Sequence, residues 1–248
     1  MTTSDVPFDS VWSAVSNVEG WMTQGQAREL YEAAANCPAD GRIVEIGSFR
    51  GRSTIVLAMA APTGTEIVAI DPHAGNDRGP QELDGYEVAA GDDHALFESN
   101  LVAAGVRDRV THVREFSDRA HQRVDGGIDV LYIDGAHRYG PALADIKDWG
   151  ARVKPGGSLL IHDSFSSIGV TGAIMRALLV NDRFRYVGRS RSLAVYRAEA
   201  GGSRMRNAFT QLAQLPWFAK NVATKIALTI GWGSLVRTLG RTPPEWPY

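Results

Sequence analysis

The sequence predicts an α/β fold: a doubly wound sheet of seven strands, mostly parallel with a C-terminal antiparallel hairpin, and helices on both faces. Two observations predict it. Short apolar runs alternate with helical patterns, which is typical of a parallel sheet covered on both faces. Two late apolar runs then follow one another closely enough to pair as a closing hairpin. The predicted strands are residues 42–46, 66–70, 109–114, 128–133, 158–161, 184–189 and 193–197.

Helical patterns connect these strands, and two segments fall outside the core. The predicted helices are residues 53–61, 139–153 and 169–182. The second is expected to end at the Pro-Gly-Gly turn of residues 155–157. The polar stretch 72–91 follows the second strand and exceeds ordinary connections in length, so it is predicted to be a lid. We therefore expect one domain at 1–200, with an N-terminal helical segment, and a C-terminal helical extension at 201–248.

The composition is that of an ordinary globular protein. The 248 residues carry a formal charge of −2, which gives no electrostatic reason to expect nucleic acid as a partner. No stretch reaches the roughly 18–20 uninterrupted apolar residues of a membrane span. The N-terminus lacks the basic and apolar regions of a secretory signal, so the cytoplasm is the expected compartment. Cys37 is the single cysteine, which excludes an intrachain disulfide and indicates a structural thiol.

The tail from residue 201 onward has a loosely helical apolar face. Such a face predicts packing on the tail's own domain or on a second copy of the chain, and we expect a homodimer. Attachment to a membrane surface is the alternative, although few lysines interleave with the apolar residues.

A glycine-rich turn follows the first strand, in the segment V-E-I-G-S-F-R-G-R-S-T at 44–54. An acid at a strand end, then two glycines and a helix start, predicts a cradle for a small molecule. Gly47 allows the backbone to approach the ligand and Gly51 allows the turn to close onto the helix. Ser53 is expected to bind there or to cap the helix. The spacing differs from the G-x-G-x-x-G that admits a pyrophosphate, and Glu45 would repel phosphate.

Acidic residues at two strand ends favour a cationic ligand that carries a ribose. Glu45 is expected to face the amino group of a methionine moiety, directly or through water. Asp71 ends the second strand, 26 residues after Glu45. Its two carboxylate oxygens suit two ribose hydroxyls. The alternative for Asp71 is a turn residue before Pro72.

Further acids end the fourth and fifth strands. Asp134 begins the sequence D-G-A-H, and Asp163 lies in H-D-S. Neighbouring parallel strands bring both to one edge of the sheet, where two carboxylates repel unless one is protonated or a cation lies between them. The pair therefore predicts a Mg²⁺ or Mn²⁺ site, with helix caps and turn contacts as the structural alternative. His137, three residues after Asp134, is expected to be the general base that deprotonates an acceptor hydroxyl.

Four motifs carry a family resemblance: E-I-G-S-F-R-G-R-S-T, A-I-D-P, L-Y-I-D-G-A-H-R-Y and K-P-G-G-S-L-L-I-H-D-S. In order and spacing they resemble class I S-adenosylmethionine-dependent methyltransferases. The resemblance implies a Rossmann-like fold, a ribose contact at Asp71, a methionine-end contact around 45–51 and adenine contacts near 116–118. It also implies that residues 20–23 lie over the cofactor. The candidate cofactor-binding residues are Glu45, Gly47, Ser48, Gly51, Ser53, Asp71, Ser117 and Asp134.

The D-G-A-H and H-D motifs resemble, more narrowly, the metal-dependent sugar O-methyltransferases of macrolide biosynthesis, and enzymes such as methylmannose-polysaccharide 1-O-methyltransferases. That resemblance implies catalytic roles for Asp134 and His137 and a metal held by Asp134, His162 and Asp163. The sugar enzymes carry an acid where this chain has His162. A neutral imidazole there weakens a Mg²⁺ site, favours Mn²⁺, or points elsewhere.

The expected function is O-methylation of a hydroxyl on a sugar, another small molecule or an oligosaccharide. The lid is polar, which suits a hydroxyl-rich acceptor better than a flat aromatic one. A catechol-like enzyme is the alternative, with Tyr86 and Phe97 as the only aromatic residues near that stretch. A nicotinamide oxidoreductase is disfavoured by the glycine spacing. An inactive cofactor-binding module would bind cofactor without turnover.

The other histidines give weaker indications. His73 opens the predicted lid and is either a substrate contact or a structural residue. His94, His112 and His121 are expected at the surface or in packing contacts. Trp149 shares a predicted helix face with other apolar residues and is expected in the core.

Overall fold

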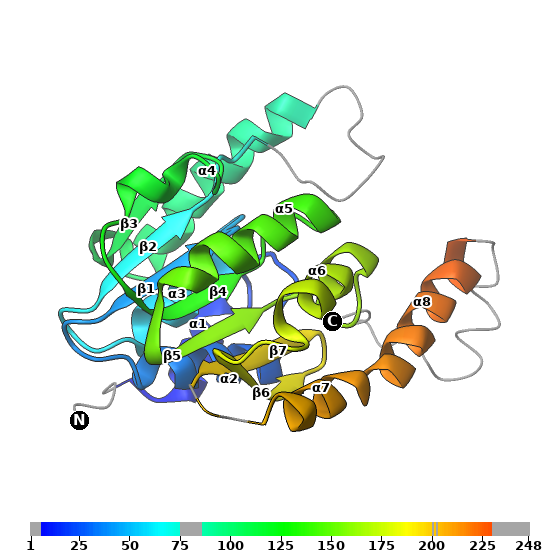
Figure 1. The fold of residues 1–248 in the computed structure, drawn as a ribbon. Coiled ribbons are helices and arrows are strands. Elements are labelled where there is room, and N and C mark those ends of the chain that lie inside the picture. The colour runs from blue at the N-terminus through cyan, green and yellow to red at the C-terminus, as the bar shows by residue number, and fades with distance from the viewer. Residues whose placement is uncertain (1–5, 75–85, 200, 202, 230–248) are drawn as a thin grey trace.

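The computed structural model describes residues 6–74, 86–199, 201 and 203–229. They contain one seven-stranded sheet in the order β3-β2-β1-β4-β5-β7-β6 (Figure 1). The first five strands are parallel, and β7 is antiparallel to both β5 and β6, which confirms the predicted fold class. The strands are β1 (Arg42–Ile46), β2 (Glu66–Ile70), β3 (Val110–Val113), β4 (Ile128–Ile133), β5 (Val153–Ile161), β6 (Phe184–Ser190) and β7 (Leu193–Ala198).

Two cores lie on opposite faces of this sheet. Successive side chains of a strand point to opposite faces, so Ile43 joins one core and Val44 joins the other. The helices of the first core are α1 (Phe8–Val15), α2 (Gln24–Ala35), α3 (Arg52–Ala60) and, through its buried Phe97 and Leu101, α4 (Tyr86–Ala103). The helices of the second core are α5 (Tyr139–Ala144) and α6 (Ile168–Leu178). Trp149 is fully buried in the second core, as predicted.

The predicted helix at 139–153 is helical over most of its length but does not keep one winding. α5 passes into a π-helical turn, η3 (Asp145–Trp149), and then a 3₁₀ turn, η4 (Gly150–Arg152). The fifth strand also starts earlier than predicted, because buried Val153 already pairs with Ile128. The Pro-Gly-Gly sequence therefore lies inside β5, at a register irregularity of the β4–β5 pair.

The predicted lid at 72–91 is only partly a loop. Residues 75–85 lie outside the described part of the chain, and from Tyr86 the backbone is already in α4. α4 leads into the 3₁₀ turn η1 (Arg107–Arg109) and then β3, while η2 (Ala120–Arg123) connects β3 to β4. The prediction was wrong for residues 86–91, because their sequence, Y-E-V-A-A-G, is mostly apolar and belongs to the helix that Phe97 and Leu101 anchor further along the chain.

The tail begins with two helices, α7 (Arg204–Leu212) and α8 (Leu215–Thr229). α7 packs on its own domain: Tyr186 N donates to Asn207 Oδ1 at 2.8 Å, and Tyr196 Oη donates to Gln211 Oε1 at 3.1 Å. Trp217 and Phe218 of α8 pack against the second core. None of the helices in the described part of the chain has the length and apolar character that a membrane span needs.

Candidate active site

A cavity of about 820 Å³ opens at the carboxyl edge of the sheet, where β1, β2 and β4 end. The strand order changes direction between β1 and β4, and ligands of open α/β sheets bind at such a switch point. The predicted site residues that line it are Gly47, Ser48, Ser53, Asp71, Ser117, Asp134 and His137. The lining does not include Glu45, Gly51, His162 or Asp163.

The glycine-rich turn is set by the neighbouring strand as much as by any ligand. Gly47 has a φ of +85°, and a Cβ there would lie 2.3 Å from the carbonyl oxygen of Asp134. Gly51 has a φ of +86° and precedes α3, and a Cβ there would lie 3.2 Å from the Phe97 ring. Both glycines are therefore needed to close β1 against β4 and α4, in addition to admitting a ligand.

Glu45 lies beneath the cavity. It is fully buried, and its two carboxyl oxygens accept hydrogen bonds from the hydroxyls of Ser53 and Thr54. Burial raises the pKa of Glu45 to about 8, against the lowering effect of these two hydroxyls, and Asp134 and Asp71 raise it further. Ser53 lines the cavity, so Glu45 reaches the site through that hydroxyl. Its direct contact with a methionine amino group stays a prediction.

Glu45→Gln is expected to remove a pH dependence of stability. A carboxyl whose pKa is higher in the folded state contributes stability below the unfolded-state value, and this contribution is lost as the pH rises towards about 8. The free energy of unfolding of the variant should therefore increase relative to that of the wild type between pH 5 and 8, by up to about 1.4 kcal/mol per pH unit. Urea unfolding at several pH values measures the difference. Glu66→Gln, at an exposed glutamate of β2, controls for the loss of one carboxylate. If the free energy of unfolding changed with pH in the same way for Glu45→Gln and for the wild type, the raised pKa of Glu45 would be contradicted.

Asp71 ties two turns together at the end of β2. Its Oδ2 accepts hydrogen bonds from the backbone N–H groups of Ser48 (2.9 Å) and Phe49 (2.8 Å), and its Oδ1 accepts one from His73 N (2.8 Å). A carboxylate offers about four acceptor sites, so lone pairs remain for ribose hydroxyls. Asp71 thus positions the glycine-rich turn as well as lining the cavity.

The carboxyl ends of β4 and β5 meet as predicted. Ile133 is in register with Ile161, which brings Asp134 beside His162 and Asp163. His162 Nδ1 lies 3.1 Å from Asp134 Oδ1 and 3.7 Å from Asp163 Oδ2. The His162 ring therefore faces both carboxylates rather than pointing elsewhere. Burial lowers the pKa of His162, but the two carboxylates outweigh it and raise that pKa.

His137 lines the cavity and forms an ion pair, through Nε2, with Asp163 Oδ2. Burial raises the pKa of Asp163, but hydrogen bonds from His137 and His162 hold it well below its usual value. Asp163 is thus an ionised acceptor that orients His137. A histidine held by a buried carboxylate, with part of its ring open to a cavity, is the arrangement of a general base.

Two contacts of the site were missed from the sequence. Tyr132 Oη donates to Asp134 Oδ2 at 2.8 Å. Gln26 Nε2 lies 3.3 Å from His162 Nε2 and donates to Ser192 Oγ at 3.0 Å. The Thr23-x-x-Gln26 capping box was a signal for the start of α2, but nothing local indicates that its glutamine reaches His162, just after β5, and Ser192, just before β7.

The regions that the resemblance assigned to the cofactor also lie along the cavity. Gly20, Trp21 and Met22 line it, as do Phe116, Ser117 and Asp118. Ser117 Oγ donates to Asp145 Oδ1 at 2.6 Å, which fixes this segment against η3. His121 is a lining residue that stacks on Trp149, with 4.5 Å between ring centroids, so it is a packing residue as predicted.

Comparisons with known proteins find a family model and a curated relative that match parts of this chain. Residues 44–164, just under half of the chain, match a family model described as a methyltransferase domain. A curated relative, the uncharacterized protein y4gI of Sinorhizobium fredii, is 26% identical over 129 residues, 50% of this chain. That match spans 13% of the relative's own length.

Solved structures share the fold at low sequence identity. The cofactor-bound protein Rv0187 from MTB has a TM-score of 0.55 at 18% identity, covering 79% of this chain and 92% of its own. The O-methyltransferase TomG from Streptomyces achromogenes, in complex with SAM, has a TM-score of 0.51 at 18% identity, covering 81% and 93%. The family match indicates a methyltransferase domain at residues 44–164, and the solved structures share the fold of the described residues.

Proposed function

We propose that this chain is an S-adenosylmethionine-dependent O-methyltransferase that acts on a hydroxyl of a sugar or oligosaccharide, with help from a divalent cation. The observation that carries the proposal is His137, which lines the large cavity and is held by the buried carboxylate of Asp163. The solved O-methyltransferase TomG, similar in fold and bound to SAM, supports the type of reaction.

The cavity fits the cofactor. Its volume of about 820 Å³ lies within the range of about 300–1,000 Å³ that small-molecule sites occupy. Gly47 and Ser48 present backbone at one wall, and Asp71 keeps acceptor capacity for a ribose. Acidic side chains at the cavity also suit the positive charge of a sulfonium and an ammonium group. The cofactor supplies a methyl group on a positively charged sulfur.

The chain's own residues supply proton transfer. The His137 imidazole, through the ring nitrogen that Asp163 does not hold, is placed to accept the proton of the acceptor hydroxyl while that oxygen attacks the methyl carbon. Asp163 fixes the ring and stabilises the imidazolium that results. Tyr132 and His162 hold the Asp134 carboxylate at the wall. Because the pair lies at the end of the sheet, the hydroxyl, the base and the methyl group share one compartment.

Asp134, His162 and Asp163 also fit a divalent cation. One ligand atom of each lies within 4.8 Å of the others. Two carboxylates with one imidazole are a donor set that Mn²⁺ accepts more readily than Mg²⁺. His162 must give up its proton to serve as a ligand. A cation held by these three residues would lower the pKa of an acceptor hydroxyl.

One observation favours the alternative of an aromatic acceptor. Trp21 and Phe49 both line the cavity, and their ring centroids lie 5.2 Å apart. Phe97, by contrast, is fully buried and offers no wall to a substrate. A catechol-like substrate stacked on the Trp21–Phe49 pair is therefore the second candidate.

A methyl-transfer assay tests the function. We expect labelled S-adenosylmethionine to methylate members of a panel of mannose and glucose derivatives and short oligosaccharides. EDTA should abolish the activity and Mn²⁺ or Mg²⁺ should restore it. Full activity in EDTA would show that the cation proposal is wrong, but it would not contradict the role of His137 as the base. Turnover of catechols but of no carbohydrate would replace the sugar with the aromatic acceptor. Cofactor binding without turnover of either panel would indicate an inactive binding module.

A further inference from the structure

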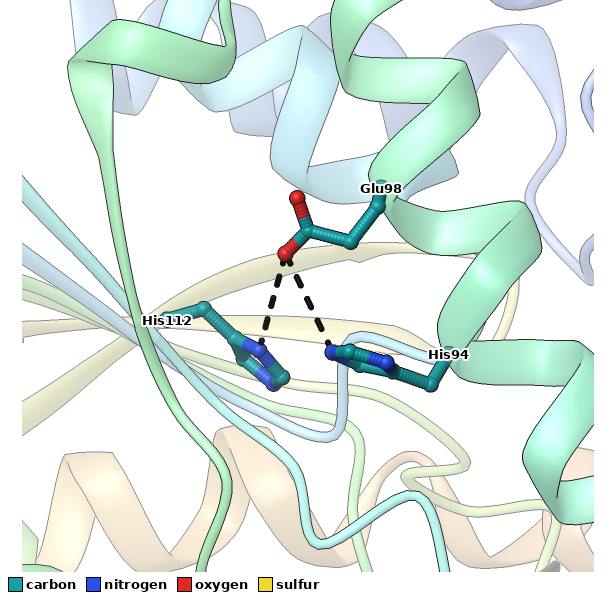
Figure 2. Close-up of side chains that lie close together, drawn as sticks. All are labelled: His94, Glu98 and His112. Atoms are coloured by element: carbon teal, nitrogen blue, oxygen red, sulfur yellow. Dashed lines mark ion pairs between the residues drawn. The ribbon is translucent and has the colours of Figure 1, made fainter.

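A second cluster of ligating side chains lies outside the active site, between α4 and β3. His94 and Glu98 are one helical turn apart on α4, so they share a face of that helix. His112 reaches them from β3. Figure 2 shows both imidazole rings on the same side of the Glu98 carboxylate, with one carboxylate oxygen directed at them. From the sequence, both histidines were expected at the surface or in packing contacts, with no indication that they meet.

The spacing of the three ligand atoms leaves a gap between them. Glu98 Oε1 lies 3.9 Å from His94 Nε2 and 4.0 Å from His112 Nδ1. Both distances exceed a hydrogen bond. Ligand atoms around a tetrahedral zinc ion, at 2.0–2.1 Å from the metal, lie about 3.4 Å apart. Small rotamer adjustments therefore close these distances around an ion.

The separation of the two rings, which are stacked, agrees with a shared ion. Two imidazoles that bind one tetrahedral ion have ring centres roughly 5 Å apart. Here the centroids of His94 and His112 are 5.3 Å apart, with an angle of 27° between the ring planes. One ligand atom of each of the three residues lies within 4.8 Å of the others.

The charges in this cluster are also those of a metal site. Burial, together with His73, lowers the pKa of His112 to about 4. Burial and then Arg114 lower the pKa of His94. Both rings are neutral at neutral pH, which is the form that coordinates metals. Arg107 forms an ion pair with the other oxygen of Glu98, so Oε1 stays directed at the rings.

We propose that His94 Nε2, Glu98 Oε1 and His112 Nδ1 bind one divalent transition-metal ion of the zinc type, with a fourth position open to water. Two imidazoles and one carboxylate form a donor set for Zn²⁺, Co²⁺ or Ni²⁺ rather than for Mg²⁺ or Ca²⁺. The three residues are half-buried, which leaves the ion a path from solvent.

Such an ion would join α4 to the sheet beside the cofactor cavity. His112 Nε2 lies 3.3 Å from the carbonyl oxygen of Asp71. His73, which lines the cavity, packs on both rings of the cluster, with centroid distances of 5.2 Å to His94 and 5.0 Å to His112. The ion is therefore structural: it holds α4 and β3 together behind Asp71 and His73 and takes no part in methyl transfer.

Titration of the metal-free full-length protein with Co²⁺, and with Zn²⁺ against a chromophoric chelator, tests the site. We expect Co²⁺ to give the visible absorption of a four-coordinate ion and Zn²⁺ to displace it. His94→Gln, Glu98→Gln and His112→Gln should each weaken binding by more than the roughly 10- to 100-fold that loss of an outer-shell partner costs. Zn²⁺ should raise the Tm of the wild type and not that of the variants.

Two further variants make the test specific. Ser99→Ala, on the exposed side of α4, removes only a hydroxyl that donates to Leu96 O, and should bind Co²⁺ as the wild type does. Asp163→Asn disables the other candidate cation site and should keep the Co²⁺ spectrum. Circular dichroism of His94→Gln, at a partly exposed helix position, establishes that this variant is folded. Absence of Co²⁺ binding by the wild type, or a spectrum lost in Asp163→Asn but retained in folded His94→Gln, would overturn the proposal.

Discussion

His137→Gln is expected to lower kcat about 10²- to 10⁴-fold, because it removes the group that accepts the proton of the acceptor hydroxyl. Glutamine retains a polar end towards Asp163, so the pocket should keep its shape. S-adenosylhomocysteine affinity should therefore change little. Steady-state methyl transfer, with calorimetric measurement of S-adenosylhomocysteine binding, separates the two effects.

A double-mutant cycle with Asp163→Asn is the control for this prediction. If Asp163 acts by holding His137, its loss should add little to an enzyme that already lacks the histidine. Independent, additive losses would show that Asp163 acts separately, for example as a cation ligand alone. An unchanged kcat in His137→Gln would show that this histidine is not the base.

Gly47→Ala is expected to destabilise the domain by about 3 kcal/mol or more and to abolish measurable cofactor binding. An alanine at a φ of +85° costs about 1–2 kcal/mol. Its Cβ would also lie 2.3 Å from the carbonyl oxygen of Asp134. Because that oxygen belongs to the backbone, no side-chain rotation can relieve the overlap. The shift would move the end of β1 away from β4, where the cavity lies. Urea unfolding and S-adenosylhomocysteine titration measure the two losses.

Gly188→Ala is the matched control. Gly188 lies in β6, remote from the cavity lining, and a Cβ there meets no atom within 4 Å among the described residues. Its unfolding free energy and cofactor affinity should stay near those of the wild type. A Gly47→Ala variant as stable as Gly188→Ala would show that the turn is not constrained by β4.

Much of the framework could be predicted because it depends on local patterns. Runs such as 128–133 are apolar for almost their full length, and a strand buried on both faces requires that. The shared location of Asp71, Asp134 and Asp163 could also be predicted. Each lies within two residues of a strand end, and parallel strands end at one edge of the sheet. Element boundaries were less accurate. Val153 joins β5 through its pairing with Ile128, which no local signal reveals.

Side-chain partners could not be predicted, because they depend on the distances between elements. No local pattern indicates that the Glu45 carboxyl accepts hydrogen bonds from Ser53 and Thr54, and its contact with a ligand stays a prediction. The sequence left open whether His162 takes part in the cation site or points elsewhere, and its contacts with Asp134 and Asp163 show that it faces the acids. His94 shares a helix face with Glu98, but His112 is 18 positions from His94, and only the packing of α4 against β3 brings it to the other two.

The sequence by itself determined the alternating α/β architecture, the glycine-rich turn and the acids at the strand ends, because hydrophobic periodicity and strand polarity operate over a few residues. The tertiary structure decided the direction in which the pKa values of Glu45 and Asp163 shift, which histidines Asp163 contacts, and why Gly47 must be glycine. Those properties depend on burial and on atoms from other strands. Periodicity along the chain carries no information about either.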